Sequence, residues 1–275
     1  MQRFSFEKVS RKDGLEGKRL YLFFDLDGTL APIRREPGKV RIPPARIRLL
    51  SRLSECENSA VAVVTGRSIK DAKKIVGLKG IVYAGNHGLE IEGRGVRKKI
   101  EKALKARQTI RTIIRALGKE LAPYKGVIVE DKGLSASVHY RMADEDKVPE
   151  IKKKIDAVTA DFARDKAVRI TAGKKVLEVR PPVNWHKGKV VLELLREERK
   201  RSGKTVVPFY FGDDVTDEDA FDVLRKTGYG VRVTRDPGER TKARYFLGGI
   251  RELDKEMRHI LSRMEARGKG GKNVR

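Results

Sequence analysis

The stretch KRLYLFFDLDG, residues 18–28, is a short, aromatic-rich apolar run that ends at a glycine. Such a run is typical of a buried β-strand followed by a turn. Asp25 and Asp27 stand at its end, and positions i and i+2 of a strand project to the same side. Two carboxylates this close repel each other unless a divalent cation lies between them. The alternative is an ordinary polar turn, in which an aspartate caps a neighbouring amide.

Strand-like and helix-like segments alternate after this stretch. Residues 45–56 have apolar residues at helical spacing, and SAVAVVTGR (59–67) is an apolar run of the kind found in strands covered on both faces. SIKDAKKIVG (68–77) begins with a serine N-cap and ends at a glycine, and GIVYAGNHG (80–88) predicts another buried strand. This alternation predicts an α/β fold with a doubly wound, Rossmann-like parallel sheet.

The pattern changes near residue 99. A long helix over 99–124 is followed by two strands, GVIVEDK and LSASVHYR, and then by a helix over about 145–164 and a strand hairpin, AVRIT and KVLEVRP, around AGK. The order helix–strand–strand therefore occurs twice. It predicts an inserted α+β domain of two α-β-β units at 106–181.

The α/β alternation resumes after the insert. HKGKVVLELLREERK predicts a helix, VVPFYFGDD a buried strand and TDEDAFDVLRKT a helix with an acidic first turn, followed by strands YGVRVT and ARYFLG. A last helix covers 250–266. We therefore expect one core made of residues 1–105 and 182–266, interrupted by the insert, and a basic, disordered tail at 267–275.

The net charge of +25 raises the hypothesis of nucleic-acid binding. However, the basic residues are spread along the whole chain among acidic ones, and aromatic residues make up only 6%, so no base-stacking surface is indicated. We therefore favour a generally basic surface that attracts anionic metabolites, and we disfavour a nucleic-acid partner.

The same composition bears on the compartment. No apolar run approaches the ~20 residues of a membrane span, and the first residues lack the apolar stretch of a signal peptide. The single cysteine, Cys56, excludes an internal disulfide framework and a thiolate metal cluster. These features predict a soluble, cytoplasmic protein with no membrane partner.

Polar segments follow several of the predicted strands, at 25–28, 65–67, 85–88 and 212–217. In an open parallel sheet, ligands lie beyond the carboxyl ends of the strands, so these segments are expected at one edge. Helix capping accounts for some acids of GDDVTDEDAF, such as Glu218 and Asp219. It does not account for Asp213 and Asp214, which precede the helix, and oxygen ligands of this kind suit Mg²⁺.

The stretch VVTGR provides the opposite chemistry. Thr65 ends its strand with a hydroxyl group, and the Gly66 amide stands at the start of a helix, where phosphate binds. Lys187 is a candidate cation for the same phosphate. Taken singly, a Thr–Gly helix entrance and a solvated lysine are the ordinary explanations of these residues.

The ordered set DLDGT, TGR, KG and GDDVTD resembles the four motifs of the haloacid dehalogenase-like (HAD) phosphatases. The resemblance implies that Asp25 is a nucleophile that forms an aspartyl phosphate, and that Asp27 is the general acid and base. It implies that Thr65 and Lys187 hold phosphate oxygens, and that the insert is a cap domain. The implied Mg²⁺ ligands are Asp25, the Asp27 carbonyl and Asp213, with support from Asp214 and Asp217.

The segments GNHG, EDKGLSASVHYR, LEVRP, KG and GDDVTDEDAF, in this order, are similar to those of trehalose-6-phosphate phosphatases over about residues 20–248. The resemblance implies that four residues of the insert contact sugar hydroxyls: Glu130, Lys132, Arg141 and Glu178. It places four further substrate-binding residues in the core: Gly66, Arg67, Asn86 and His87. From the residues alone, the polar face of the insert could equally be a solvated sheet with cross-strand ion pairs.

The sequence thus predicts a Mg²⁺-dependent phosphatase that converts trehalose 6-phosphate to trehalose and phosphate in trehalose biosynthesis. One alternative is another capped sugar phosphatase, acting on mannosyl- or glucosyl-3-phosphoglycerate or on sucrose phosphate. An alternative of another class is a basic nucleic-acid-binding protein on a disused HAD scaffold. Functional pairing with a trehalose-6-phosphate synthase is a further expectation, and Trp185 and His186 receive no role.

Overall fold

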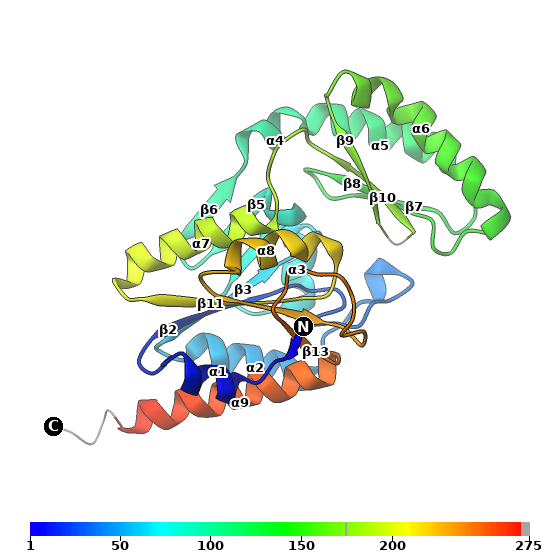
Figure 1. Ribbon diagram of the computed structural model, residues 1–275. Coiled ribbons are helices and arrows are strands. Elements are labelled where there is room, and N and C mark those ends of the chain that lie inside the picture. Colours follow the sequence, from blue (N-terminus) through cyan, green and yellow to red (C-terminus); the bar gives the residue numbers. More distant parts are fainter. Residues whose placement is uncertain (174, 271–275) are drawn as a thin grey trace. The chain divides into compact units, whose positions relative to one another are not determined.

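The structure, a computed structural model, describes residues 1–173 and 175–270, the side chains of 267–270 excepted (Figure 1). The chain divides into two compact units, Met1–Arg97 with Trp185–Arg275, and Lys98–Asn184. The second unit begins before the predicted boundary at 106, because helix α4 (Glu101–Lys105) contacts helix α5 (Arg107–Leu121).

A large sheet forms the centre of the first unit. In the described part of the chain it has nine strands, in the order β1 (Gln2–Arg3), β13 (Tyr245–Leu247), β12 (Tyr229–Val233), β11 (Val206–Gly212), β2 (Arg19–Phe24), β3 (Ser59–Val64), β4 (Val82–Gly85), β5 (Glu90–Gly93) and β6 (Val96–Lys99). The strands from β1 to β4 are parallel, and β5 is antiparallel to β4. The chain extends from β2 through β3 and β4, and later returns to β11 on the other side. The predicted doubly wound sheet is confirmed.

Strand β2 is buried on both faces because its side chains alternate between two cores. Leu20, Leu22 and Phe24 belong to the core on one face of the sheet, and Tyr21 and Phe23 belong to the core on the other. Fully burying each of these side chains contributes about 1.5–3 kcal/mol, so the opening stretch holds the two layers of helices to the sheet.

Helices cover both faces of this sheet (Figure 1). Helices α1 (Phe6–Lys12), α2 (Pro44–Glu55), α3 (Ile69–Val76) and α9 (Ile250–Gly270) provide the apolar residues of one core. Helices α7 (Lys187–Ser202) and α8 (Glu218–Leu224) provide those of the other. Helix α3 has the predicted Ser68 N-cap, whose Oγ accepts from the Asp71 amide, and it ends at Gly77 with a left-handed φ of 69°.

Several elements of the first unit differ from expectation. The elements β1, α1, β5 and β6 were not predicted from the sequence, although the Ser5 side chain caps α1 as an N-cap residue should. Helix α9 runs beyond the predicted end at 266, to Gly270. Residues 271–275 of the predicted disordered tail lie outside the described residues.

The second unit contains the two predicted helix–strand–strand repeats. Helix α5 precedes β7 (Ile128–Asp131) and β8 (Ala136–His139), and helix α6 (Val148–Arg164) precedes β9 (Arg169–Gly173) and β10 (Val176–Arg180). Over the described residues these strands form an antiparallel sheet of four in the order β7-β8-β10-β9. The predicted single helix over 99–124 is wrong, because β6 includes Lys99 and Ala106 separates α4 from α5.

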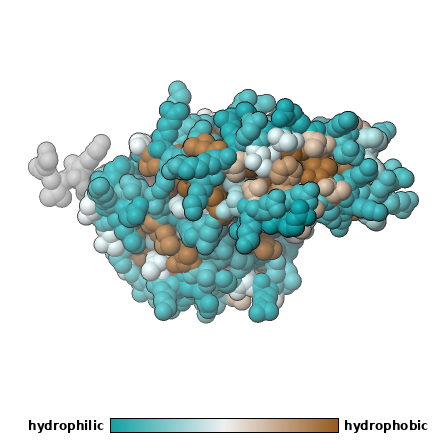
Figure 2. Space-filling view, turned by 90° about the horizontal axis from the view of Figure 1, so that it is seen from above, coloured by the Kyte–Doolittle hydropathy of each residue, from teal (hydrophilic) through white to brown (hydrophobic). Residues whose placement is uncertain are grey.

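The surface agrees with the high content of charged residues. On the face drawn in Figure 2, hydrophilic side chains cover most of the area, and hydrophobic residues form smaller areas among them. Among the described helices, none combines the length and the apolar character that crossing a membrane requires.

Candidate functional site

The candidate site lies where the strand order reverses. Strands β2 and β11 are parallel neighbours, and Asp25 and Asp213 directly follow their carboxyl ends. The Asp25 amide continues the pairing, since it donates to the Phe211 carbonyl at 2.9 Å. Ligands of open parallel sheets bind at this kind of position, so the fold brings together two acids 188 residues apart in sequence.

Two glycines allow the acidic side chains to approach this closely. Gly28 has a φ of 90°, and a Cβ atom there would lie 2.0 Å from Asp213 Oδ2. A Cβ atom at Gly212 would lie 2.5 Å from Asp217 Oδ2. Both positions therefore need glycine, which also explains why glycines adjoin the aspartates in the sequence.

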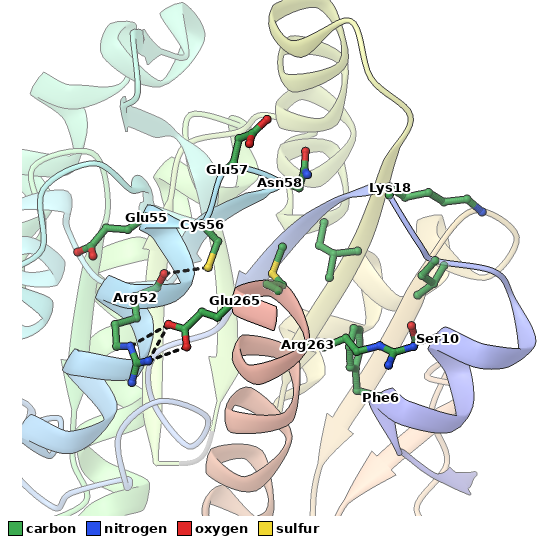
Figure 3. Close-up of a pocket in the computed structure, with 14 residues that line it drawn as sticks. Phe6, Ser10, Lys18, Arg52, Glu55, Cys56, Glu57, Asn58, Arg263 and Glu265 are labelled. Carbon is green, nitrogen blue, oxygen red and sulfur yellow. Dashed lines mark hydrogen bonds and ion pairs between the residues drawn. The ribbon is translucent and has the colours of Figure 1, made fainter. Parts of the chain in front are cut away.

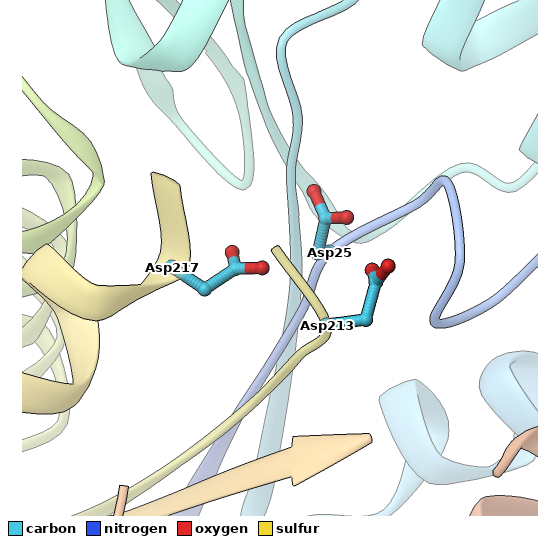
Figure 4. A group of neighbouring side chains, drawn as sticks. All are labelled: Asp25, Asp213 and Asp217. Carbon is cyan, nitrogen blue, oxygen red and sulfur yellow. The ribbon is translucent and has the colours of Figure 1, made fainter. Parts of the chain in front are cut away.

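Asp25, Asp213 and Asp217 form an acidic cluster, in which one oxygen of each lies within 4.8 Å of the others. Figure 4 shows these neighbouring side chains, with Asp25 and Asp213 at the ends of β2 and β11 and Asp217 at the turn before α8. Burial, with Asp217 and Asp213 nearby, raises the pKa of Asp25 well above its ordinary value, although Lys187 opposes the shift. Burial and Asp217 likewise raise the pKa of Asp213 to about 7.

Lys187 is the buried cation of this site. Its Nζ donates to Asp25 Oδ1 and to Asp217 Oδ1, each at 2.7 Å. Burial alone would lower the pKa of Lys187, but Asp217 and Asp25 outweigh it and raise the pKa above its ordinary range. Lys187 begins helix α7, and Gly188 beside it packs on the Asp219 carbonyl, where a Cβ atom would lie at 2.3 Å.

Asp217, which was expected only to support the metal site together with Asp214, joins Asp25 and Asp213 in the cluster. Its Oδ1 also accepts from the Tyr210 hydroxyl at 2.6 Å, and its Oδ2 accepts from the Asp214 amide at 2.9 Å. Asp214 lies outside the cluster, because its side chain caps the turn Val215–Asp217 in a capping box. Asp217 thus has fewer lone pairs left for a cation than Asp25 or Asp213 has.

The residues of the cluster fit a divalent cation. When Asp25, Asp213, Asp217 and Lys187 are all ionised, three carboxylates face one ammonium group, which leaves two negative charges. Buried like charges raise the pKa values described above, and a bound cation would relieve this repulsion. Carboxylate oxygens are the ligands that hard divalent cations prefer.

Asp27 is paired with an arginine instead of joining the cluster. Arg67 Nε and Nη2 donate to the two oxygens of Asp27, at 2.7 and 2.8 Å. The Asp27 backbone lies in the turn after β2, where residue 27 forms a bridge with Ala31. Arg67 was predicted among the substrate-binding residues, and its pairing with Asp27 was not predicted.

Thr65 and Gly66 lie at the end of β3, as predicted. Thr65 is buried, and its Oγ1 accepts from the Arg67 amide at 3.2 Å. Gly66 faces the imidazole of His87, and a Cβ atom there would lie 2.7 Å from both Cε1 and Nε2. His87 is therefore close to the segment that the sequence analysis expected to bind phosphate.

Asn86 and His87 both have left-handed backbones, with φ values of 51° and 56°. Asn86 is fully buried, and its side-chain amide donates to Glu90 Oε1 at 2.9 Å, as does the Ile69 amide. The Asn86 amide donates to the Arg67 carbonyl at 2.7 Å. These contacts hold the 86–88 turn against the start of α3.

Three residues that support the site were missed by the sequence analysis. Tyr210 holds Asp217, and Arg232 holds the acidic loop through the Asp214 carbonyl at 3.3 Å and Glu218 at 2.8 Å. Trp185 Nε1 donates to the Gly88 carbonyl at 2.8 Å. One signal was available, because an arginine in the apolar strand YGVRVT is unusual without a buried partner.

The polar residues of the second unit are paired with one another across its sheet. The strand register places Glu130 opposite Ser137, and Ser137 opposite Glu178. His139 Nε2 lies 2.8 Å from Glu130 Oε2, and Lys132 Nζ donates to Glu178 Oε1 at 3.1 Å. The sheet therefore contains one cross-strand ion pair, Lys132 with Glu178, of the kind predicted as the alternative, and a hydrogen bond between His139 and Glu130. Arg141 lies partly buried just after β8.

A cavity of about 590 Å³ lies at the opposite edge of the large sheet. Figure 3 shows that residues of α1, α2 and α9 and the segments before β2 and β3 line it, with Arg52 paired to Glu265 at 2.7 Å. It lies at the amino ends of the strands, whereas the acidic cluster lies at their carboxyl ends. We assign no function to this cavity.

Comparisons with known proteins agree with this geometry. A family model described as trehalose-phosphatase matches residues 23–250. Among curated proteins, the trehalose-phosphate phosphatase of Mycobacterium bovis is 37% identical over 244 residues, which are 88% of this chain and 61% of the relative. Trehalose-phosphate phosphatase B of Arabidopsis thaliana is 33% identical over 257 residues, which are 90% and 67% of the two chains.

This chain thus spans about three fifths of the length of the mycobacterial relative. Among solved structures, the C-terminal domain of the C. albicans trehalose-6-phosphate phosphatase has a TM-score of 0.79 at 22% identity. That match covers 95% of this chain and 98% of the other, and it shows that the two share a fold.

Proposed function

Because the chain belongs to the trehalose-phosphatase family, we propose that it hydrolyses trehalose 6-phosphate to trehalose and inorganic phosphate. The observation that supports this most is the place of Asp25. Its carboxylate is buried at the carboxyl end of a central strand, beside a second acid and a cation, Asp213 and Lys187. A nucleophile held among such groups suits attack on an anionic phosphate.

In the proposed reaction, an oxygen of Asp25 attacks phosphorus and forms an aspartyl phosphate. The bond from phosphorus to the sugar oxygen breaks, and that oxygen takes a proton from Asp27. Asp27 then takes a proton from the water that attacks the aspartyl phosphate, and phosphate leaves with Asp25 restored. Thr65 and the Gly66 amide, together with Lys187, are proposed to hold phosphate oxygens.

We propose Mg²⁺ as the cation of this site. Asp25 and Asp213 would hold it, with the Asp27 carbonyl as a further ligand and with Asp214 and Asp217 in support. When bound, Mg²⁺ would offset the repulsion between the nucleophile and the substrate phosphate.

The second unit is proposed as the inserted cap domain that selects the sugar. Its polar sheet face carries paired donors and acceptors, which suit a ligand with many hydroxyl groups, and the proposed contacts are Glu130, Lys132, Arg141 and Glu178. In the core, Asn86 and His87 are proposed to face the substrate. Functional pairing with a trehalose-6-phosphate synthase and a cytoplasmic location remain predictions from the sequence.

Phosphate release from a panel of sugar phosphates tests the proposed function. We expect fastest turnover of trehalose 6-phosphate, slower turnover of sucrose phosphate and of mannosyl- and glucosyl-3-phosphoglycerate, and almost none with EDTA. Equal turnover of the other sugar phosphates and none of trehalose 6-phosphate would overturn the proposed substrate.

The stabilisation of the protein by Mg²⁺ should depend on pH. The pKa of Asp213 in the folded, metal-free protein is about 7, above its value in an unfolded chain, so the folded state binds this proton more tightly. The resulting stabilisation is complete below the unfolded pKa of about 4 and is lost as pH rises through the folded value. At low pH the proton on Asp213 competes with Mg²⁺ for the carboxylate. At high pH Asp213 has lost this proton, and Mg²⁺ can take its place.

We therefore expect Mg²⁺ to raise the Tm more at about pH 8 than at about pH 5.5. Thermal unfolding at constant ionic strength, with MgCl₂ or EDTA, measures this difference. A rise in Tm of the same size at both pH values would contradict the assignment of Asp213 as a ligand.

Changes in the polar face of the second unit should separate sugar recognition from chemistry. Glu130→Ala and Arg141→Ala should each lower kcat/KM for trehalose 6-phosphate by roughly 10- to 100-fold, because each would remove hydrogen bonds to sugar hydroxyls. They should leave kcat/KM for p-nitrophenyl phosphate nearly unchanged. Glu120→Ala, which changes a half-exposed glutamate of α5 that pairs, within the described residues, only with Lys154 of α6, is the matched control. Equal losses on both substrates would show that this face does not select the sugar.

A further inference from the structure

Arg67 determines the orientation of the Asp27 carboxylate in this structure. Its Nε lies 2.7 Å from Oδ2 of Asp27, and its Nη2 lies 2.8 Å from Oδ1. Two parallel hydrogen bonds of this kind fix both the position and the plane of a carboxylate, which a single lysine ammonium cannot do.

Arg67 is itself fixed from several sides. Its Nη1 donates to the Pro37 carbonyl at 3.1 Å, and its amide donates to Thr65 Oγ1 at 3.2 Å. Its carbonyl accepts from the Asn86 amide at 2.7 Å. The side chain of Arg67 is 11% exposed and that of Asp27 is 34% exposed, so the arginine holds the carboxylate from the protein side while the carboxylate stays accessible.

We infer that Arg67 is a positioning residue that orients Asp27 toward the leaving oxygen, and that it does not bind the substrate phosphate. The inference rests on the proposed function, because it assigns the part that Arg67 has in that reaction. Asp27 gives a proton to the sugar oxygen when its bond to phosphorus breaks, and it later accepts one from the attacking water. Both transfers need a carboxylate oxygen at a defined place, and the paired hydrogen bonds from Arg67 hold the Asp27 oxygens in a fixed position.

The competing role for Arg67 is that of a phosphate ligand. Arginine suits this role well, but the Arg67 guanidinium would first have to break its two hydrogen bonds to Asp27. The two roles differ in their kinetics. Loss of a phosphate ligand raises KM for every phosphate monoester, whereas loss of a positioning residue lowers kcat for substrates whose leaving group needs a proton.

Arg67→Gln tests the inference with two substrates. Trehalose 6-phosphate has a sugar alkoxide as its leaving group, which needs a proton, whereas p-nitrophenolate leaves readily without one. We expect kcat for trehalose 6-phosphate to fall roughly 100-fold, and kcat for p-nitrophenyl phosphate and both KM values to change less than about threefold. Arg67→Lys keeps the positive charge but lacks the paired N–H donors of the guanidinium, so it should recover only part of the loss. Arg48→Gln, at an exposed position of α2, should change nothing.

Two results would overturn the inference. One is an equal loss of kcat on both substrates with a raised KM, which would mark Arg67 as a phosphate ligand. The other is an unchanged kcat for trehalose 6-phosphate. If Arg67→Gln unfolds, Arg67→Lys is compared in the wild type and in Asp27→Asn; we expect no further loss of kcat in the second, and a further loss would refute the inference.

Failure of the proposed function would be separately visible. A wild-type protein that releases no phosphate from trehalose 6-phosphate would refute the proposed substrate. Arg67→Gln would then be tested with another sugar phosphate that the wild type hydrolyses, in place of trehalose 6-phosphate. We expect the same difference between that substrate and p-nitrophenyl phosphate.

Discussion

Asp25→Asn will abolish phosphate release from trehalose 6-phosphate, with a fall in kcat of roughly 10⁴-fold or more. The amide of asparagine is a much weaker nucleophile than a carboxylate, so the proposed aspartyl phosphate cannot form. Phosphate release at saturating substrate with Mg²⁺ measures the loss. Asp156→Asn, at an exposed position of α6, is the matched control and should retain full activity.

The same variant should be at least as stable as the wild type without divalent ions. Burial together with Asp217 and Asp213 raises the pKa of Asp25, which means that its charged form destabilises the metal-free fold. Asparagine removes that charge. Residues that are needed for activity often lower the stability of the fold, so their replacement can raise it. Thermal unfolding in EDTA gives the comparison. An inactive variant with a much lower Tm would mean that the loss of activity reflects misfolding.

Lys187→Ala will destabilise the protein by about 3–5 kcal/mol, because it leaves buried carboxylates without their cation. The side chains of Lys187, Asp25 and Asp217 are all almost fully buried, and Lys187 Nζ lies 2.7 Å from both acids. Activity should fall with stability, since the proposed phosphate ligand is lost. Urea unfolding measures the free energy difference, and Lys200→Ala, at an exposed position of the same helix, is the control.

A second substitution should restore part of this stability. Asp217→Asn in the Lys187→Ala background removes one of the two carboxylates that the lysine neutralised. The double variant should therefore be more stable than Lys187→Ala alone. If the double variant is less stable still, the interaction of Asp217 with Tyr210 and the Asp214 amide matters more than its repulsion with Asp25.

The place of the acidic cluster could be predicted because it depends on short-range patterns. Apolar runs identify the central strands, and the carboxyl ends of parallel strands meet at one edge, so Asp25, Asp213 and Thr65 had to converge. The glycines at 28 and 212 mark close approach in the sequence, and the structure shows acidic groups where their Cβ atoms would lie.

The partners of these residues could not be predicted in the same way. Lys187 lies between Asp25 and Asp217, and Arg67 binds both oxygens of Asp27, and the sequence predicted neither of these pairings. Each of these pairs joins residues 30 to 162 positions apart. Which cation meets which acid depends on rotamers, loop geometry and burial, none of which has a periodic signal in the sequence.

The polar face of the second unit shows the same division. Alternation in SASVHYR predicts which residues share a face, and the place of Ala136, Val138 and Tyr140 in the hydrophobic core of the second unit agrees with it. The pairing of Lys132 with Glu178 depends on the register between strands, which no single strand reveals.

The chain alone was thus sufficient to specify a doubly wound sheet and the acids at its carboxyl edge, because periodicity and strand direction are local properties. Only the tertiary structure distinguished Asp217, which lies in the cluster, from Asp214, which caps a turn, and only it showed that Arg67 holds Asp27. The physical reason is that a buried charge takes the partner that folding brings within hydrogen-bond distance, and that distance is determined by packing over the whole unit.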